Sequence, residues 1–264
     1  MFAGLEAKWP TAVRRIDARE NINDALEYVF EFLAAMRVRV PAARDAAEAI
    51  ERERVKATMR SLDHRGLLPP RPAGLTEGMI DIVINPHQSI HAMPQIARGF
   101  AVVVDTLGFE ILCNDTVVPF ITNDNPVMYF EADRPIKKLE PYRNAGKIEL
   151  LMPISLTRVL RGHPDLKPRY GSEGVEYRPI DSAAEIRRIN TLAAKFGYDF
   201  VFANSREHDT TITKYLDVAP ILRTRQVASN LAFEFVFGPK PRKPKWRKEH
   251  RVPLSPQPLD DPSA

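Results

Sequence analysis

The chain has 264 residues, with 38 Lys and Arg against 34 Asp and Glu, 23 Pro, one Cys and 44% hydrophobic residues. This composition is ordinary for a globular domain and excludes collagen-like, mucin-like and wholly disordered chains. The single Cys113 excludes an intramolecular disulfide and a multi-thiolate metal site. No apolar run approaches the roughly 20 residues of a membrane helix, and the first residues have no signal-peptide pattern. We therefore expect a cytoplasmic protein without a membrane span.

The positive net charge belongs to the C-terminal end. Residues 239–251 hold seven Lys and Arg with one Glu, and Asp260 and Asp261 follow, which leaves residues 1–238 with a formal charge of zero. Proline occupies seven of the last 26 positions, so this end cannot bury enough apolar surface to order itself. We predict a disordered basic tail over 239–264. It either contacts nucleic acid or another anionic partner weakly through 239–251, or it is a solubilising end without a partner.

Helical patterns dominate the first hundred residues. Apolar residues recur every third or fourth position over 20–40, which predicts a helix with one buried face. Pro41 suits the first position of a second helix, which we expect over 42–64. The proline-rich segment 67–74 breaks the pattern, and a further helix is expected over 76–100.

Short β-branched or aromatic runs follow, bounded by Asn, Asp, Gly and Pro. They predict strands at 109–112, 119–122, 127–130, 148–153, 158–161, 198–203 and 231–237. Between the fifth and sixth runs, Ser182 and Glu185 have the spacing of a capping box, and Gly197 closes the helix that they begin. Residues 171–174 are expected to form a flexible turn.

This order of elements predicts an α+β fold, with a helical N-terminal half packed on a mostly antiparallel sheet and one or two further helices. We expect one domain over 1–238, divided into a helical part, 1–100, and a sheet part, 101–238.

Local catalytic motifs of the common hydrolases, zinc proteases, kinases and dinucleotide-binding enzymes are absent from the sequence. His87 and His91 would share one face of a helix, as metal ligands do, but a third ligand is not identifiable. The sequence therefore assigns no cofactor and no metal.

Three arginines, Arg37, Arg39 and Arg44, flank the junction of the first two predicted helices. Such a cluster could hold a phosphate or carboxylate with paired hydrogen bonds. Alternatively, these cations stabilise a helix end and pair with nearby carboxylates.

A polar cluster lies between two predicted strands and consists of Thr122, Asn123, Asp124 and Asn125. Its oxygens could ligate a divalent cation, or Asp124 could act as a base. A structural alternative is an Asx-turn, in which Asn and Asp side chains bond the nearby backbone and the following proline keeps Asn125 extended.

Five segments together carry a resemblance to a known family. They are RVRVPAARDA (37–46), FEILCN (109–114), PFITNDNPV (119–127), LLMPISLTRVL (150–160) and EIRRINTLAAKFGYDFVFAN (185–204). In this order they resemble the bacterial family called domain of unknown function 4238 across nearly all of 1–205. Asn123 stands where the family usually has Ser, and Asn190 on the late helix belongs to the resemblance. The resemblance implies no activity.

Members of that family usually open with a His-Tyr-x-Pro-Gln type segment, which this chain lacks. If that segment normally covers the helices or the sheet, its absence leaves apolar surface or a strand edge exposed. We therefore expect self-association, with a homodimer as its simplest form.

Two functional hypotheses remain open, and the sequence does not decide whether the protein is an enzyme. In the first, it is a hydrolase or nuclease in which Asp124 is catalytic and the three arginines bind an anion. Thr122, Asn123, Asn125 and Asn190 would complete the binding site. In the second, it is a non-catalytic binding module with structural polar turns and a basic tail. Convergence of Asp124 and Arg39 on one cleft would favour the enzyme.

Overall fold

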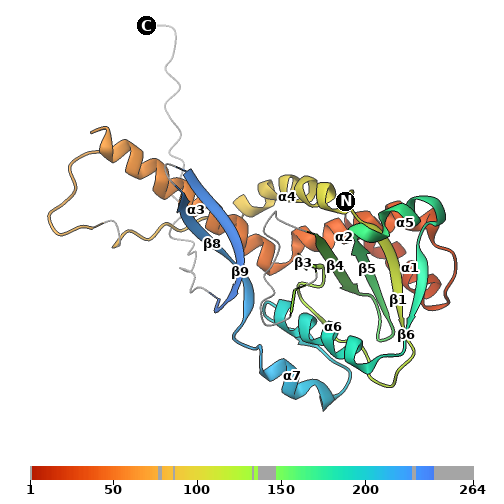
Figure 1. Ribbon diagram of the computed structural model, residues 1–264. Coiled ribbons are helices and arrows are strands. Elements are labelled where there is room, and N and C mark those ends of the chain that lie inside the picture. Colours follow the sequence, from red (N-terminus) through yellow and green to blue (C-terminus); the bar gives the residue numbers. More distant parts are fainter. Residues whose placement is uncertain are drawn as a thin grey trace, which may run out of the picture.

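The computed structural model describes residues 2–76, 79–85, 87–132, 134–135, 147–227 and 230–240, and its architecture confirms the α+β class (Figure 1). The helices are α1 (Phe2–Asp17), α2 (Leu26–Arg39), α3 (Pro41–His64), α4 (Gln88–Val104), α5 (Lys167–Glu173), α6 (Ala183–Phe196) and α7 (Asp209–Thr213). The strands are β1 (Gly108–Asn114), β2 (Thr122–Asn123), β3 (Met128–Glu131), β4 (Ile148–Pro153), β5 (Arg158–His163), β6 (Glu176–Ile180), β7 (Val201–Phe202), β8 (Ala219–Val227) and β9 (Asn230–Gly238).

A five-stranded sheet in the order β3-β4-β5-β1-β6 is the largest sheet in the described part of the chain. Its pairings are antiparallel except between β1 and β6, which run parallel, so the sheet is mixed. Short β2 and β7 pair with each other, and β8 and β9 form a separate hairpin.

Helices cover both faces of the sheet. Successive residues of a strand point to opposite faces and therefore pack into two different hydrophobic cores. In β1, Ile111 packs toward α1, α2 and α4, whereas its neighbour Leu112 packs toward α6. In β4, Leu150 and Leu151 divide in the same way. The β1 and β4 strands are buried along their whole length because both faces are covered.

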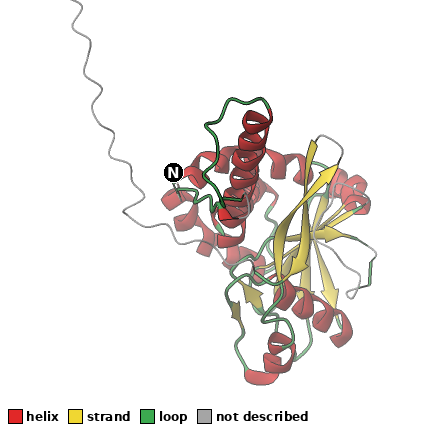
Figure 2. Ribbon diagram, turned by 90° about the vertical axis from the view of Figure 1, so that its left-hand side faces the viewer, coloured by secondary structure: helices red, strands yellow, loops and turns green. Residues whose placement is uncertain are grey.

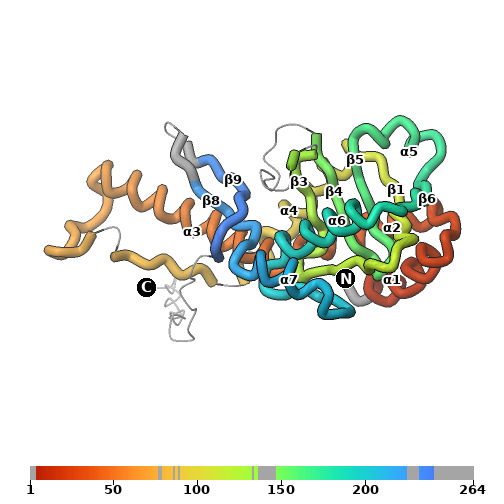
Figure 3. The backbone as a smooth tube through the Cα atoms, turned by 60° about the horizontal axis from the view of Figure 1, so that its bottom comes forward, coloured from red at the N-terminus to blue at the C-terminus, as the bar shows by residue number. Residues whose placement is uncertain are grey.

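The far half of α3 and the loop after it project from the sheet, and the β8–β9 hairpin lies beside this helix (Figures 1, 2 and 3). A small core joins them, in which Ala42 and Ala43 of α3 pack with Ala219 and Ile221 of β8 and with Tyr198.

An ionic ladder crosses the sheet under α6. Its charges alternate in the order Arg188, Glu149, Arg161, Glu110, Arg178 and Glu185, and each neighbouring pair lies 2.8 to 3.1 Å apart. Burial acts to raise the pKa of Glu149, but the attraction and hydrogen bonds of Arg188 and Arg161 outweigh it and hold that pKa below its ordinary value.

Several expected boundaries are wrong for identifiable reasons. The helix expected over 20–40 begins only at Leu26, after a 3-10 turn at Asn23–Ala25. The helix expected over 76–100 begins at Gln88, after the Asn85 side chain accepts the His87 N–H in an Asx-turn. Ile82, which precedes this turn, is not helical. Its backbone carbonyl accepts a hydrogen bond from Arg52 at 3.0 Å.

Other differences concern the sheet. The runs at 119–122 and 198–203 contribute only the two-residue strands β2 and β7. Strands β6 and β8 were not expected, and residues 171–173 belong to α5 instead of a flexible turn. The predicted capping box does not form: Ser182 makes no side-chain capping bond, and the Glu185 carboxylate pairs with Arg178 instead.

None of the helices in the described part of the chain is long and apolar enough to cross a membrane. The predicted basic tail lies outside the described residues from position 241 onward. Lys240, near its start, is described and forms an ion pair with Asp199 at 2.6 Å.

Candidate functional site

Asp124 joins the loop before β3 to the chain that leaves α6. Its carboxylate oxygens accept hydrogen bonds from the backbone N–H groups of Tyr198 at 2.7 Å and Asp199 at 2.8 Å. The backbone N–H of Asp124 donates in turn to the Phe200 carbonyl. These contacts tie the turn after α6 to the loop, so Asp124 has a structural role through distant backbone and not through the local Asx-turn.

The neighbouring asparagines are buried and bond the same helix. Asn123 donates to the Ala193 carbonyl at 2.6 Å, and its side-chain oxygen accepts the Asn125 N–H at 2.7 Å. Asn125 donates to the Phe196 carbonyl at 3.3 Å. The two asparagines therefore hold the C-terminal end of α6, where the Ala193 carbonyl also accepts the Gly197 N–H.

Asn190 and Thr122 lie apart from these contacts. Asn190 accepts the Ile121 N–H at 3.0 Å and donates to the Pro119 carbonyl at 2.8 Å, so both of its side-chain atoms hold the backbone before β2. Thr122 pairs with Phe202 across β2 and β7 and lines a cavity of about 380 Å³ there.

The three arginines of the predicted cluster do not form one site, because each has different surroundings. Arg39 forms an ion pair with Glu6 of α1, and the exposed Arg44 lies 3.9 Å from Asp45. Arg37 points into the protein and is only 8% exposed. Helix periodicity explains the separation, because Arg37 lies four residues after the buried Leu33, whereas Arg39 lies two positions further on and faces another direction.

The Arg37 guanidinium has hydrogen-bond donors that its neighbours do not fully satisfy. Its Nη2 atom donates to the Tyr129 hydroxyl at 3.2 Å, and Nη1 lies at 3.5 Å from the Asn125 side-chain oxygen, at the outer limit of a hydrogen bond. The guanidinium also lies over the Tyr129 ring, 5.0 Å from its centroid. Its Nε atom is buried and has no hydrogen-bond partner. Among the described residues, no carboxylate forms an ion pair with Arg37.

Arg37 and Tyr129 line two cavities in common, one of about 220 Å³ and one of about 20 Å³. Phe235 of β9 also lines both cavities. The larger cavity lies among α3, α4, β3 and β9. The smaller one, also lined by Ala42 and Asn125, is large enough for a water molecule. Neither cavity is lined by Asp124 or Arg39, so these two residues do not share a cleft with Arg37.

The first turn of α3 lies beside the smaller cavity. Its N-cap residue, Val40, provides no side-chain hydrogen bond, and Pro41 has no N–H group. The next residue, Ala42, lines that cavity. Backbone N–H groups at a helix N-terminus attract anions, but Phe196 at the C-terminal end of α6, where the potential is negative, lines the same cavity, so Arg37 is the source of net positive charge there.

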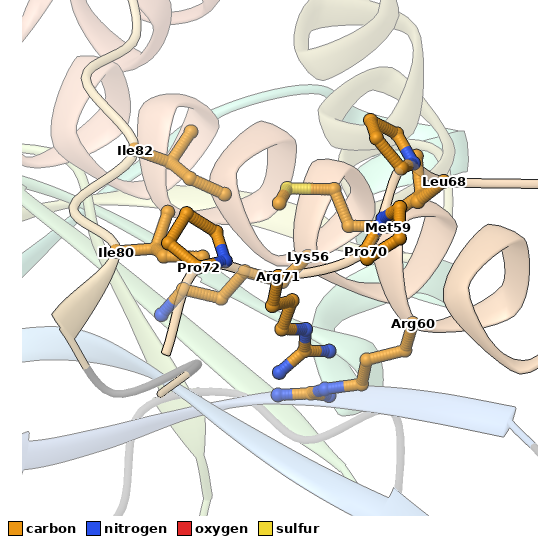
Figure 4. Close-up of a pocket in the computed structure, with 10 residues that line it drawn as sticks. Lys56, Met59, Arg60, Leu68, Pro70, Arg71, Pro72, Ile80 and Ile82 are labelled. Atoms are coloured by element: carbon orange, nitrogen blue, oxygen red, sulfur yellow. The ribbon is translucent and has the colours of Figure 1, made fainter. Parts of the chain in front are cut away.

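Another cavity, of about 200 Å³, lies under the proline-rich loop after α3 (Figure 4). Met59 and Ile82 supply part of its apolar lining, and its basic residues are Lys56, Arg60 and Arg71. Lys56 and Arg71 form ion pairs with carboxylates on α3. Because much of its charge is compensated within the chain, this cavity is a weaker candidate than the one at Arg37.

No group of three His, Cys, Asp or Glu side chains that could hold a metal ion occurs among the residues that the structure describes. His91 lines a cavity with Glu48 and Glu51. His87 is exposed and does not line that cavity.

Comparison with known proteins assigns the chain to a family. The sequence family described as "Protein of unknown function (DUF4238)" matches residues 1–207. The chain belongs to this family. Arg37, Asn125 and Tyr129 lie inside the matched range, whereas the β8–β9 hairpin that adds Phe235 lies beyond it. Neither the curated proteins nor the solved structures contain a match to this chain.

Sequence reasoning selected Arg37 and Asn125 but missed Tyr129 and Phe235. The signal for the burial of Arg37 was present, since Val29, Leu33 and Arg37 follow one helical stripe. No local signal identifies Phe235, because its place beside Arg37 depends on how the hairpin packs.

Proposed function

We propose that the protein binds a small organic anion whose carboxylate or phosphate group contacts Arg37. The observation that carries this proposal is a nine-tenths buried guanidinium with an unpartnered Nε and no ion pair among the described residues. Removing a charge from water costs several kcal/mol unless a counter-charge and hydrogen bonds compensate it. An anionic ligand supplies both.

Recognition would follow from the geometry of the guanidinium. Arg presents planar, paired donors that match the two oxygens of a carboxylate or phosphate. Tyr129 fixes the plane of the group by stacking and by its hydroxyl, and Asn125 lies at the opposite nitrogen.

The hydrolase or nuclease hypothesis has weaker support. Both carboxylate oxygens of Asp124 accept backbone hydrogen bonds, and Asp124 does not line the cavities at Arg37. The alternative of a non-catalytic binding module agrees better with these contacts. The basic tail could contribute to nucleic-acid binding, but from position 241 onward it lies outside the described part of the chain.

The test is a thermal-shift titration with sodium acetate and sodium phosphate, with sodium chloride at equal ionic strength as the control. A ligand at ten times its dissociation constant stabilises the folded state by about 1.4 kcal/mol, which corresponds to a few degrees in a protein of this size. We expect a saturable rise in Tm for the wild type and none for Arg37→Met.

Arg44→Met is the matched control, because it removes an equal charge from an exposed position on α3. This variant should retain the anion-dependent rise. A wild type that responds to acetate and phosphate no more than to chloride would overturn the proposal, as would an equal response in Arg37→Met.

A further inference from the structure

We infer that the anion bound at Arg37 carries a compact apolar body, about the size of one aromatic ring or a six-carbon chain, and a single negative charge. This inference rests on the proposed function and specifies its ligand class as small arene- or alkanecarboxylates. It follows from the lining, volume and charge of the larger cavity.

Most of the lining is apolar, and its charged residues are Arg37, Arg54 and Glu51. The apolar side chains are Ala43, Ala46, Ala47 and Ile50 of α3, Ala92 and Ile96 of α4 and Phe235 of β9. The four α3 residues follow one another at helical spacing and therefore share one face. With Tyr129 also lining the cavity, a ligand held by Arg37 meets apolar and aromatic surface on several sides.

Small side chains create the space. Ala43, Ala46 and Ala47 are buried at positions where larger residues would fill the region between α3 and its neighbours. The resulting volume is about 220 Å³. An apolar cavity of about 150 Å³ accepts benzene, and cavities for drug-sized ligands begin near 300 Å³. The space therefore suits one ring or a short chain and is small for a nucleotide.

The other charges of the cavity compensate each other. Arg54 and Glu51 both line it, and they form an ion pair at 2.7 Å. Gln95 adds a neutral polar group. Arg37 is thus the cation without a carboxylate partner among the described lining residues, and one negative charge on the ligand balances it.

The test compares the affinities of acetate, butyrate, hexanoate and benzoate, with benzyl alcohol as a neutral analogue. For the wild type we expect affinity to rise at least about tenfold from acetate to benzoate and hexanoate, because the added carbons leave water. Benzyl alcohol should bind at least about tenfold more weakly than benzoate, because it lacks the charge.

Ala47→Leu fills the cavity and should remove most of the gain for benzoate while acetate binding changes less than about threefold. Ala92→Leu narrows the cavity from α4 at a half-buried position and provides the same test if Ala47→Leu does not fold. Val55→Leu, which adds volume at an exposed position on α3, is the control and should leave all affinities unchanged.

The outcomes separate the two proposals. If acetate and phosphate bind through Arg37 but hexanoate and benzoate bind no more tightly, the apolar ligand class is wrong and the anion site stands. The same holds if both filling variants leave benzoate affinity unchanged. If neither the carboxylates nor phosphate bind through Arg37, the proposed function fails as well.

Discussion

At the scale of single residues, the polar cluster before β3 makes both local contacts, which the sequence predicts, and distant contacts, which it does not. Turn chemistry predicted that Asn123, Asp124 and Asn125 bond local backbone, and the Asn123 to Asn125 contact agrees with this. Their other partners, including the Ala193 carbonyl and the Tyr198 N–H, lie about 70 residues further along the chain. No local pattern specifies such contacts, because they depend on where α6 packs.

Asp124→Ala should lower the free energy of unfolding by roughly 1–3 kcal/mol, because two backbone N–H groups lose their acceptor. Urea denaturation checks this loss, with Asp105→Ala, at an exposed position after α4, as the control. We expect no Tm response to Mg²⁺, Mn²⁺ or Ca²⁺ in the wild type. A clear metal-dependent rise that disappears in Asp124→Ala would instead support the metal hypothesis for this loop.

At the scale of elements, strands with strong β-branched patterns and the α6 helix were predictable, whereas β6 and β8 were not. Residues of β6 are mostly half-buried, and Pro179 lies within it, so the run has neither clear alternation nor a typical strand composition. The ladder under α6 was also invisible in sequence, because its charges come from four strands and one helix.

The ionic ladder under α6 predicts that the folded protein loses stability in acid. The pKa of Glu149 is lowered in the folded state, so its contribution to stability is present above its ordinary pKa of about 4.5. That contribution is lost as the pH falls through the lower folded-state value. Glu149→Gln should cost roughly 1.5–3 kcal/mol at pH 7, because Arg188 loses its carboxylate partner and Arg161 keeps only Glu110.

The difference between wild type and Glu149→Gln should therefore shrink as the pH falls below about 4.5, as measured by urea denaturation across pH. Glu173→Gln is the control, since Glu173 forms an exposed ion pair that contributes little. A cost for Glu149→Gln that stays constant from pH 7 to pH 3 would contradict this account of the ladder.

At the scale of the whole molecule, the family match ends at residue 207, yet the β8–β9 hairpin beyond it completes the cavity at Arg37. The sequence predicted one α+β domain, but not that its last strands leave the main sheet and lie beside α3. Such placement depends on long-range packing that local patterns do not encode.

Deletion of residues 241–264 should leave Tm unchanged within about one degree, because proline and charged residues give this segment no periodic apolar face. Deletion from position 239 also removes Lys240, which pairs with the exposed Asp199, and should lower Tm only slightly more. Differential scanning calorimetry distinguishes these results. A fall of several degrees after removal of 241–264 would mean that the segment contributes to packing.

The free energy of unfolding of Arg37→Met, measured in buffer without carboxylate or phosphate, tests directly whether Arg37 serves a ligand. If Arg37 is kept for a ligand, replacing this unpaired buried cation with an apolar side chain of similar length should leave the protein equally stable or more stable. Saturating benzoate should then stabilise the wild type alone. A loss of several kcal/mol in Arg37→Met, with no benzoate effect on the wild type, would instead make Arg37 a structural residue and contradict the account.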